Sequence, residues 1–426
     1  MTLKIQDIYK LYELSDLKVS TDTRKIETGS LFFALKGGNF NGNLFAEKAL
    51  ESGAKYAIVD EKHIEDERLI LVDDVLKCLQ DLANHHRRVL GTRLLGIGGS
   101  NGKTTSKELI VSVLSTELYT HFTQGNLNNH IGVPLTLLQL RAHHEIAVVE
   151  LGANKTGDIM ELCLIAEPDM GIITNIGKEH LEGFGGIEGV AKAESELFDY
   201  VLKNNGYAFV NMDDKWLANM GKRLLEKSSY SMQMDGISEV HTVPSIVFHY
   251  KGEEISSVLM GEHNFQNIAA TIAVAQYLNI SLPNIKKGIE AYVPSNNRSQ
   301  LIHTEKGNTV LLDAYNANPS SVEMALRTFE KMEGEKIALL GDMFELGIYE
   351  AQEHQAIAEL CKNSPINQCF LVGLAFDQTQ VESANVQTFK HKEEALIAIR
   401  QKGYKRVNVL IKGSRGMKME DFLKEF

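Results

Sequence analysis

Residues 95–107 read LGIGGSNGKTTSK, and this stretch decides how the surrounding chain folds. An apolar run ends in a glycine-rich loop, and Lys103 and Thr104 then begin a segment with a helical pattern. Glycines let backbone N–H groups converge on an oxyanion, and a helix N-terminus adds partial positive charge. In such loops the lysine reaches the terminal phosphates of a nucleotide and the threonine hydroxyl contacts Mg²⁺. Ile97 stands where the standard pattern has its first glycine, so the alternative is a simple glycine turn before a helix.

The apolar runs on either side predict a parallel sheet around this loop. RLLGIGG, EIAVVELG and MGIITNI are bounded by glycine and polar residues, as buried parallel strands are, and each precedes a helical pattern. Glu150 ends the second strand, and His180 follows the third. Ligands bind at the carboxyl ends of such strands, where a carboxylate suits Mg²⁺. Taken alone, Glu150 could equally form a salt bridge, and His180 could equally be a hydrogen-bonding loop residue.

The segment TQGNLNNHIGVP (124–135) precedes another helical pattern and is rich in asparagine. Asparagine side chains cap helices or bind polar ligands. Capping accounts for one of Asn126, Asn128 and Asn129, but not for all three.

A chain of 426 residues is too long for one ordinary core, so two or three domains are expected. We place them at 1–82, 83–292 and 293–426. In the first, SLFFAL, YAIVD and LILVDD predict strands, and the Asp-Asp pair at 73–74 predicts a helix start. In the third, NTVLLDAY, KIALLGD, CFLVG and RVNVLIKG predict strands alternating with helices at SSVEMALRTFEKM, EAQEHQAIAELCK, KEEALIAIRQ and MEDFLKEF.

Composition excludes several classes of protein. The net charge of −12 argues against non-specific binding to nucleic acid or to an anionic membrane surface. No apolar run of about 18 residues predicts a membrane span, and the N-terminus lacks the apolar core of a signal peptide. The four cysteines (Cys78, Cys163, Cys361 and Cys369) have no CxxC spacing, which fits a reducing cytoplasmic setting.

Eight motifs, in order from about residue 20 to the C-terminus, together resemble those of the Mur ligases. They are GSNGKTT, GNLNNHIGVP, ELGANKTGDI, TNIGKEHLEGFG, GEHNFQNIAA, DAYNANPSS, GDMFELG and KGSRGMKME. The resemblance implies an α/β fold of three domains: a smaller α/β N-terminal domain that binds the uridine end of a UDP-sugar, a central P-loop-type parallel-sheet domain that binds ATP, and a C-terminal Rossmann-like domain. DAYNANP, GDMFELG and KGSRG are particular to the family member whose third domain binds D-alanyl-D-alanine.

The implied activity is an ATP-dependent ligase that adds D-alanyl-D-alanine to UDP-N-acetylmuramoyl-tripeptide through an acyl phosphate. The enzyme would be a cytoplasmic monomer of peptidoglycan precursor synthesis and would use ATP with two Mg²⁺ ions. One alternative is another Mur-type or folylpolyglutamate-type amide ligase. The other is a P-loop ATPase that forms no bond.

The resemblance also implies roles for individual residues. Lys103, Glu150, His180 and Glu194 would be catalytic, and the metal ligands would be Thr104, Glu150, His180 and Glu194. ATP would be bound by Gly99, Ser100, Asn101, Gly102, Lys103, Thr104, Thr105, Asn264, Asn267, Arg298 and Asp313. The other substrates would be bound by Thr23, Arg24, Asn126, Asn128, Asn129, Asn316, Asn318 and Asp342. A hinge is expected at 293–297, and His354 is a candidate base, with a surface histidine as the alternative.

The sequence departs from the family pattern in two places. Asn41, Gly42 and Asn43 stand where the family has an Asp-Gly-His element. Glu194 stands where the family has a lysine that reacts with CO₂, and Lys192, two residues earlier, would point to a different side of a helix. We therefore expect Glu194 to supply a carboxylate oxygen directly, without CO₂. The alternative is that Glu194 is a solvated helix residue.

Overall fold

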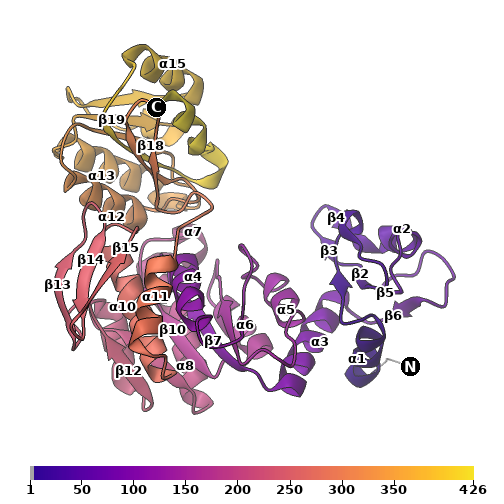
Figure 1. Cartoon of the computed structure of the whole chain (residues 1–426). Helices are drawn as coiled ribbons and strands as arrows, with labels where there is room; N and C mark the ends of the chain where they lie inside the picture. The colour runs from indigo at the N-terminus through magenta and orange to yellow at the C-terminus, as the bar shows by residue number, and fades with distance from the viewer. Residues whose placement is uncertain (1–3) are drawn as a thin grey trace.

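The computed structural model describes residues 4–426, which form three α/β domains (Figure 1). The N-terminal domain has a parallel sheet in the order β1 (Val19–Ser20), β2 (Leu31–Phe33), β5 (Tyr56–Val59) and β6 (Leu69–Leu71). It also contains α1 (Ile5–Leu14), α2 (Ala46–Glu51) and a short hairpin of β3 (Lys36–Gly37) and β4 (Phe40–Asn41). The predicted strands of this domain are therefore confirmed.

Helix α3 (Val75–Leu90) connects this domain to the next. Its start was predicted from the Asp-Asp pair, and the Asp74 side chain indeed accepts a hydrogen bond from the Lys77 backbone N–H. The helix ends at Gly91, which adopts a left-handed conformation. Our domain boundary at 82–83 falls inside this continuous helix.

The central domain is built on a six-stranded, fully parallel sheet. The strand order is β12 (Lys227–Tyr230), β11 (Tyr207–Asn211), β10 (Met170–Ile173), β7 (Arg93–Gly98), β9 (Ile146–Glu150) and β8 (Thr120–Phe122). The three predicted strands are β7, β9 and β10, and they lie side by side in the middle of the sheet. The loops after these strands therefore meet at one edge, where a ligand is expected.

Helices cover both faces of this sheet. They are α4 (Lys103–Leu114), α5 (Gly132–Leu137), α6 (Asp158–Ala166), α7 (Leu181–Phe184), α8 (Ile187–Lys203), α9 (Lys215–Met220), α10 (Glu262–Tyr277) and α11 (Leu282–Ala291). Helices α10 and α11 both pack against α4, which begins at the phosphate loop. The sequence did not predict the antiparallel sheet of β13 (Ile237–His241), β14 (Ile246–Tyr250) and β15 (Glu253–Ser257).

The C-terminal domain has a second six-stranded sheet. Its order is β16 (Gln300–His303), β17 (Thr309–Asp313), β21 (Asn408–Lys412), β18 (Lys336–Gly341), β19 (Gln368–Val372) and β20 (Val386–Phe389), and only β16 is antiparallel. Its helices are α12 (Pro319–Glu330), α13 (Glu350–Lys362), α14 (Leu374–Asp377) and α15 (Lys392–Lys402).

One predicted helix of this domain is a different kind of helix. The segment MEDFLKEF forms a 3₁₀ helix, Met419–Glu425, rather than an α-helix. Met419 and Phe422 are both fully buried. A 3₁₀ helix repeats every three residues, so it turns this pair to the same side, toward the sheet.

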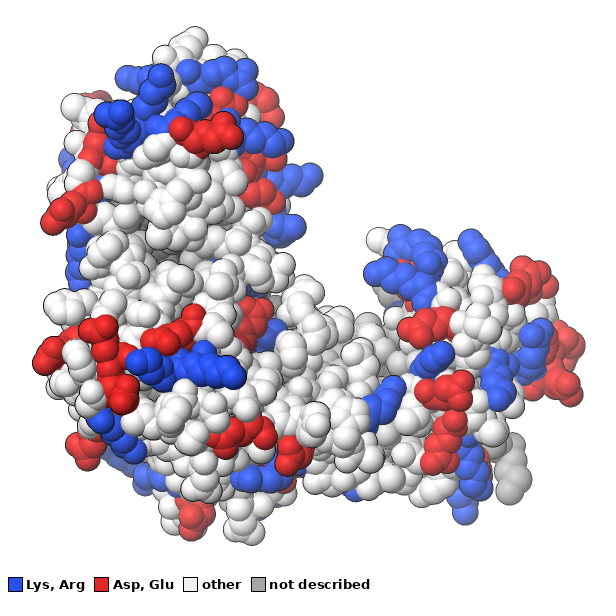
Figure 2. Space-filling view, in the orientation of Figure 1, with Lys and Arg blue, Asp and Glu red and all other residues white. Residues whose placement is uncertain are grey.

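The three domains form an open arrangement. The C-terminal domain lies on the central domain near α7 and α12, whereas the N-terminal domain stands off to one side beyond α3 and α5 (Figure 1). Figure 2 shows the hollow between the two outer domains, with Lys and Arg side chains numerous at the far end of the C-terminal domain. Within residues 4–426, no helix combines the length and apolarity that a membrane crossing requires.

Candidate active site

The loop after β7 has the conformation of a phosphate cradle. Gly99 (φ +114°) and Gly102 (φ +78°) have positive φ angles, and a Cβ atom at Gly99 would lie 2.2 Å from the Thr174 hydroxyl oxygen. The Ser100 N–H donates to the Asn175 carbonyl at 2.9 Å, which holds the loop against the strand end of β10. The first turn of α4 lines the adjoining cavity and presents free N–H groups, as any helix N-terminus does.

Lys103 lies at the mouth of this cradle among three carboxylates. Its ammonium group donates to the Gly99 carbonyl and lies 3.4 Å from Glu179 Oε2. Burial works to lower the pKa of Lys103, but the charges of Glu179, Glu194 and Glu150 outweigh it and raise the pKa above its ordinary value. Lys103 is therefore a permanent cation where a phosphate would bind.

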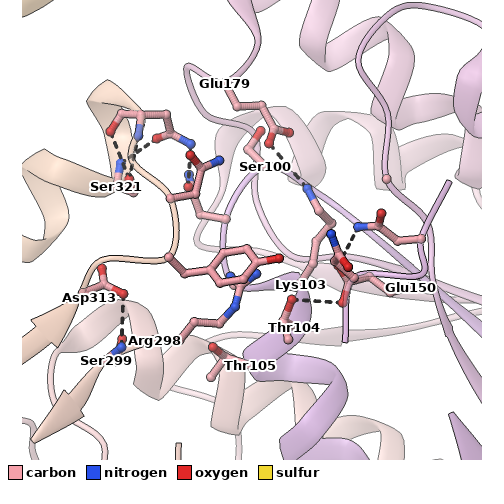
Figure 3. Close-up of a pocket in the computed structure, with 18 of the residues that line it drawn as sticks. Ser100, Lys103, Thr104, Thr105, Glu150, Glu179, Arg298, Ser299, Asp313 and Ser321 are labelled. Atoms are coloured by element: carbon pink, nitrogen blue, oxygen red, sulfur yellow. Dashed lines mark hydrogen bonds and ion pairs between the residues drawn. The ribbon is translucent and has the colours of Figure 1, made fainter. Parts of the chain in front are cut away.

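Glu150 and Thr104 form a pair of oxygen donors beside the loop (Figure 3). The Thr104 hydroxyl donates to Glu150 Oε2 at 3.0 Å, and the Asn128 amide donates to Oε1 at 2.9 Å. Lys107 lies 3.8 Å from Oε2, with only 1% of its side chain exposed. The predicted carboxylate at the end of β9 therefore faces the first turn of α4.

Glu179 is a site residue that the sequence did not single out. Its side chain lines the cavity and points toward Lys103 (Figure 3), and its Oε1 atom is buried without a hydrogen-bond partner among residues 4–426. Burial raises the pKa of Glu179 to about 8. Its place directly before His180 in TNIGKEHLEGFG was the available signal. His180 also lines the cavity, and its Nδ1 atom lies 2.5 Å from Glu345 Oε2 of the C-terminal domain.

The C-terminal domain closes the cavity from the opposite side. Asp313 accepts a hydrogen bond from the Ser299 N–H at 3.1 Å and forms an ion pair with Lys412 at 2.5 Å. The Arg298 guanidinium stacks on the Tyr315 ring, 3.7 Å from its centroid. The cavity, of about 350 Å³, is thus shared between two domains.

Three polar contacts hold these two domains together next to the loop. The Asn318 amide donates to Asn101 Oδ1 at 2.8 Å, and the Lys178 N–H donates to the Ser320 hydroxyl at 2.8 Å. The Lys178 ammonium group also lies 2.7 Å from Glu353 Oε1, a buried carboxylate. Lys178, next to Glu179 in the sequence, is thus one of the residues through which the central domain contacts the C-terminal domain.

Most of the predicted site residues line this one cavity. They are Ser100, Asn101, Gly102, Lys103, Thr104, Thr105, Asn126, Asn128, Asn129, Glu150, His180, Asn264, Asn267, Arg298, Asp313, Asn316 and Asn318. Asn267 accepts a hydrogen bond from the Ser106 hydroxyl at 3.0 Å, which ties α10 to α4.

Glu194 lies behind the loop rather than on the cavity surface. It is fully buried, and its Oε2 atom accepts a hydrogen bond from the Gly99 N–H at 2.6 Å. Its Oε1 atom has no partner among the described residues, and burial raises the pKa of Glu194. Gly99 likewise does not line the cavity. The alternative of a solvated Glu194 is wrong, whereas its role as a metal ligand stays a prediction.

Three other predicted residues lie away from the cavity. Asp342 is buried and accepts hydrogen bonds from the Ala375 and Phe376 N–H groups, both at 3.0 Å, so it caps α14. Thr23 and Arg24 lie in the N-terminal domain, where the exposed Arg24 guanidinium pairs with Asp22 at 2.7 Å. Their role in binding the uridine end of a substrate stays a prediction.

Two further residues have structural roles. His354 is fully buried: Nδ1 lies 2.8 Å from the Glu350 carbonyl, and Nε2 accepts from the Met343 N–H at 3.0 Å. Because the ring is buried and both nitrogens have backbone partners, His354 is not placed to take a proton from a substrate. The prediction of a base there and the alternative of a surface histidine were both wrong. Asn43, which stands where the family has histidine, is also buried and bonds to Asp60 at 2.7 Å.

Models of known protein families match all three domains of the chain. The Mur ligase middle domain matches residues 97–275, and the Mur ligase glutamate ligase domain matches residues 297–415. The catalytic domain of the Mur ligase family matches residues 18–87. The chain is a member of the Mur ligase family.

Individual Mur ligases are similar over nearly the whole chain. The UDP-N-acetylmuramoyl-tripeptide–D-alanyl-D-alanine ligase of Bacillus subtilis is 37% identical, over 96% of this chain and 92% of that protein. The ligase of the same name from Escherichia coli is 32% identical, over 95% and 92%. Among solved structures, MurF from Acinetobacter baumannii is similar with a TM-score of 0.86 and 32% identity, covering 96% of this chain and 92% of its own. MurF from Thermotoga maritima, solved in complex with ADP, has a TM-score of 0.87 and 25% identity, covering 97% and 98%. The expected three-domain Mur ligase fold is thereby confirmed.

Proposed function

We propose that this chain is the ATP-dependent ligase that joins D-alanyl-D-alanine to UDP-N-acetylmuramoyl-tripeptide in peptidoglycan precursor synthesis. The observation that carries this proposal is the cavity between two domains, where the phosphate loop of one faces Arg298 and Asp313 of the other. Relatives more than 30% identical over more than nine-tenths of the chain carry this activity in their names. The enzyme would act in the cytoplasm as a monomer.

In the first step the terminal carboxylate of the tripeptide attacks the γ-phosphate of ATP, giving an acyl phosphate and ADP. A carboxylate must here approach a polyanion, so the barrier is chiefly electrostatic. Lys103 offers a buried positive charge beside the loop, and the free N–H groups at the start of α4 offer further donors. The fold of the loop and of α4 positions these groups, so they are preorganised for the developing negative charge.

The residues present fit a magnesium ion. Thr104 and Glu150 place a hydroxyl and a carboxylate oxygen 3.0 Å apart, both of the hard oxygen type that Mg²⁺ prefers. When bound there, the ion would neutralise phosphate charge as a Lewis acid. Among residues 4–426, no group of three or more Asp, Glu, His or Cys side chains is placed to hold a metal ion, so Thr104 and Glu150 are the residues proposed to hold it. His180 remains a proposed ligand alongside Glu150, and Glu194 remains a proposed ligand for a second ion.

In the second step the amine of the dipeptide attacks the acyl carbonyl and phosphate leaves. Water must be kept out, because it would hydrolyse the acyl phosphate. The contacts of Asn318 with Asn101 and of Lys178 with Glu353 hold the C-terminal domain over the loop and would serve this purpose. The N-terminal domain borders the hollow seen in Figure 2, and we propose that it holds the uridine end of the long substrate there.

A phosphate-release assay with each substrate omitted in turn tests this function. We expect release only when ATP, Mg²⁺, UDP-N-acetylmuramoyl-tripeptide and D-alanyl-D-alanine are all present. Release with ATP alone would favour the P-loop ATPase. Turnover with folate and glutamate would favour a folylpolyglutamate-type ligase. The folylpolyglutamate synthase of Mycobacterium tuberculosis is only 15% identical, at a TM-score of 0.62, so that likeness concerns the fold alone.

A further inference from the structure

A second cavity opens beside the phosphate loop and carries positive charge. Its walls are Thr104, Gly125, Asn126, Asn296, Asn297, Arg298, Tyr315 and Arg415. Two guanidinium groups line it, and none of its lining residues is acidic. In a chain with a net charge of −12, such a cavity is a local device for binding an anion.

The two arginines differ in which cavities they line. Arg298 lines both cavities, whereas Arg415 lines only the second one. Both lie near the Tyr315 ring, with Cζ atoms 3.7 Å and 5.8 Å from its centroid. Cation–π contacts of this kind orient a guanidinium without using its N–H donors. Arg415 therefore belongs to the part of the site that the second cavity adds to the first.

Arg415 keeps part of its hydrogen-bonding capacity free. Its Nη1 atom lies 3.2 Å from Glu420 Oε1, and 62% of its side chain is exposed. A guanidinium has five N–H donors in a planar fork, so one ion pair leaves donors for a second carboxylate. The planar guanidinium can donate two parallel hydrogen bonds to the two oxygens of a carboxylate.

We propose that Arg415 binds the C-terminal carboxylate of the acceptor dipeptide and thereby sets the specificity for a free carboxylate. This inference rests on the proposed function. The two cavities share Thr104, Asn126, Arg298 and Tyr315, so one ligand can extend from the second into the first. An extended dipeptide spans about 7 Å, so its carboxylate and its amine can occupy different parts of these joined cavities.

The test compares two acceptors, D-alanyl-D-alanine and its C-terminal amide, in the full-length enzyme. The variants are Arg415→Met and Arg415→Lys. Arg327→Met is the matched control, because Arg327 belongs to the same domain, is 57% exposed and also pairs with glutamate. KM and kcat are measured for each acceptor, and KM is measured for ATP and for the UDP-linked tripeptide.

We expect Arg415→Met to raise KM for the dipeptide about ten- to a hundredfold, the effect of losing a charged hydrogen bond. KM for the amide should stay the same, Arg415→Lys should be intermediate, and Arg327→Met should behave as wild type. An equal loss for acid and amide would overturn the proposal. So would a rise in KM confined to ATP or to the UDP-linked tripeptide, because the bound anion would then belong to that substrate. If the wild type turns over neither acceptor, the proposed function itself fails; an unchanged acid preference in an active variant overturns only the role of Arg415.

Discussion

Replacing Lys107 by methionine should destabilise the central domain. Lys107 follows Lys103 by one turn of α4, and its ammonium group donates to the Thr123 carbonyl at 2.8 Å. It also lies 3.8 Å from Glu150 Oε2, where 3% of the Glu150 side chain is exposed. One buried ammonium group therefore connects helix α4 with the Thr123 carbonyl, directly before the asparagine-rich segment, and with Glu150, the predicted metal ligand.

The size of the effect follows from burial. Methionine fills nearly the same volume but leaves the Glu150 carboxylate without its cation and the Thr123 carbonyl without its donor. Removing one partner of a buried ion pair costs about 3–5 kcal/mol of unfolding free energy. Glu150→Gln removes the stranded charge, so the double variant Lys107→Met/Glu150→Gln should regain part of this loss while remaining inactive.

The single tryptophan, Trp216, makes the measurement specific to one domain. It lies in α9 of the central domain and is 37% exposed, so its fluorescence reports unfolding of that domain. Urea unfolding would be followed for wild type, the two single variants and the double variant. Lys287→Met, an exposed change on α11, serves as the control. The reasoning is refuted if the Lys107→Met midpoint equals that of Lys287→Met, or if the double variant loses as much as the two single changes summed.

Three other predictions concern acidic residues. Burial raises the pKa of Glu179 from 4.5 to about 8, so between these values the folded protein holds a proton that the unfolded chain lacks. Stability should therefore fall as the pH rises from about 5 to 8, and Glu179→Gln should flatten this slope in thermal unfolding; an unchanged slope would contradict the prediction. Activity in CO₂-depleted buffer should equal that in ordinary buffer if Glu194 supplies its own carboxylate, and a carbamylated lysine in the mass spectrum, or full activity of Glu194→Ala, would disprove this. Asp342→Ala should cost about 1 kcal/mol of stability through the lost cap of α14, with KM for the dipeptide unchanged; a higher KM at unchanged stability would instead assign Asp342 to substrate binding.

The sequence predicted the elements whose signal is local. A buried strand, a glycine loop and a helix start each depend on a few consecutive residues. For this reason β7, the phosphate loop and α4 were all placed correctly. Because parallel strands end at one edge, the sequence also placed Glu150 and His180 in one cavity. The weak, half-exposed pattern of β13–β15 carried no comparable signal, and this sheet was missed.

The roles of individual polar side chains depended on distant partners. Asp342 lies in the GDMFELG motif and His354 on the helix that follows it, yet both side chains form hydrogen bonds with backbone groups of their own domain. Glu179 and Tyr315 stand inside quoted motifs but were not singled out, and both line the cavity. Lys107 carried no motif of its own, and the structure places it 3.8 Å from Glu150 Oε2.

By itself, the amino-acid sequence determined the parallel strands around the phosphate loop and the loop itself, because strand burial, glycine conformations and helix starts are properties of neighbouring residues. Only the tertiary structure decided which charges face one another. Lys103 meets Glu179 across 76 positions of sequence, and Lys178 meets Glu353 across 175. Electrostatic interactions depend on distance in space and on burial, and neither can be calculated from the order of the residues before the chain is folded.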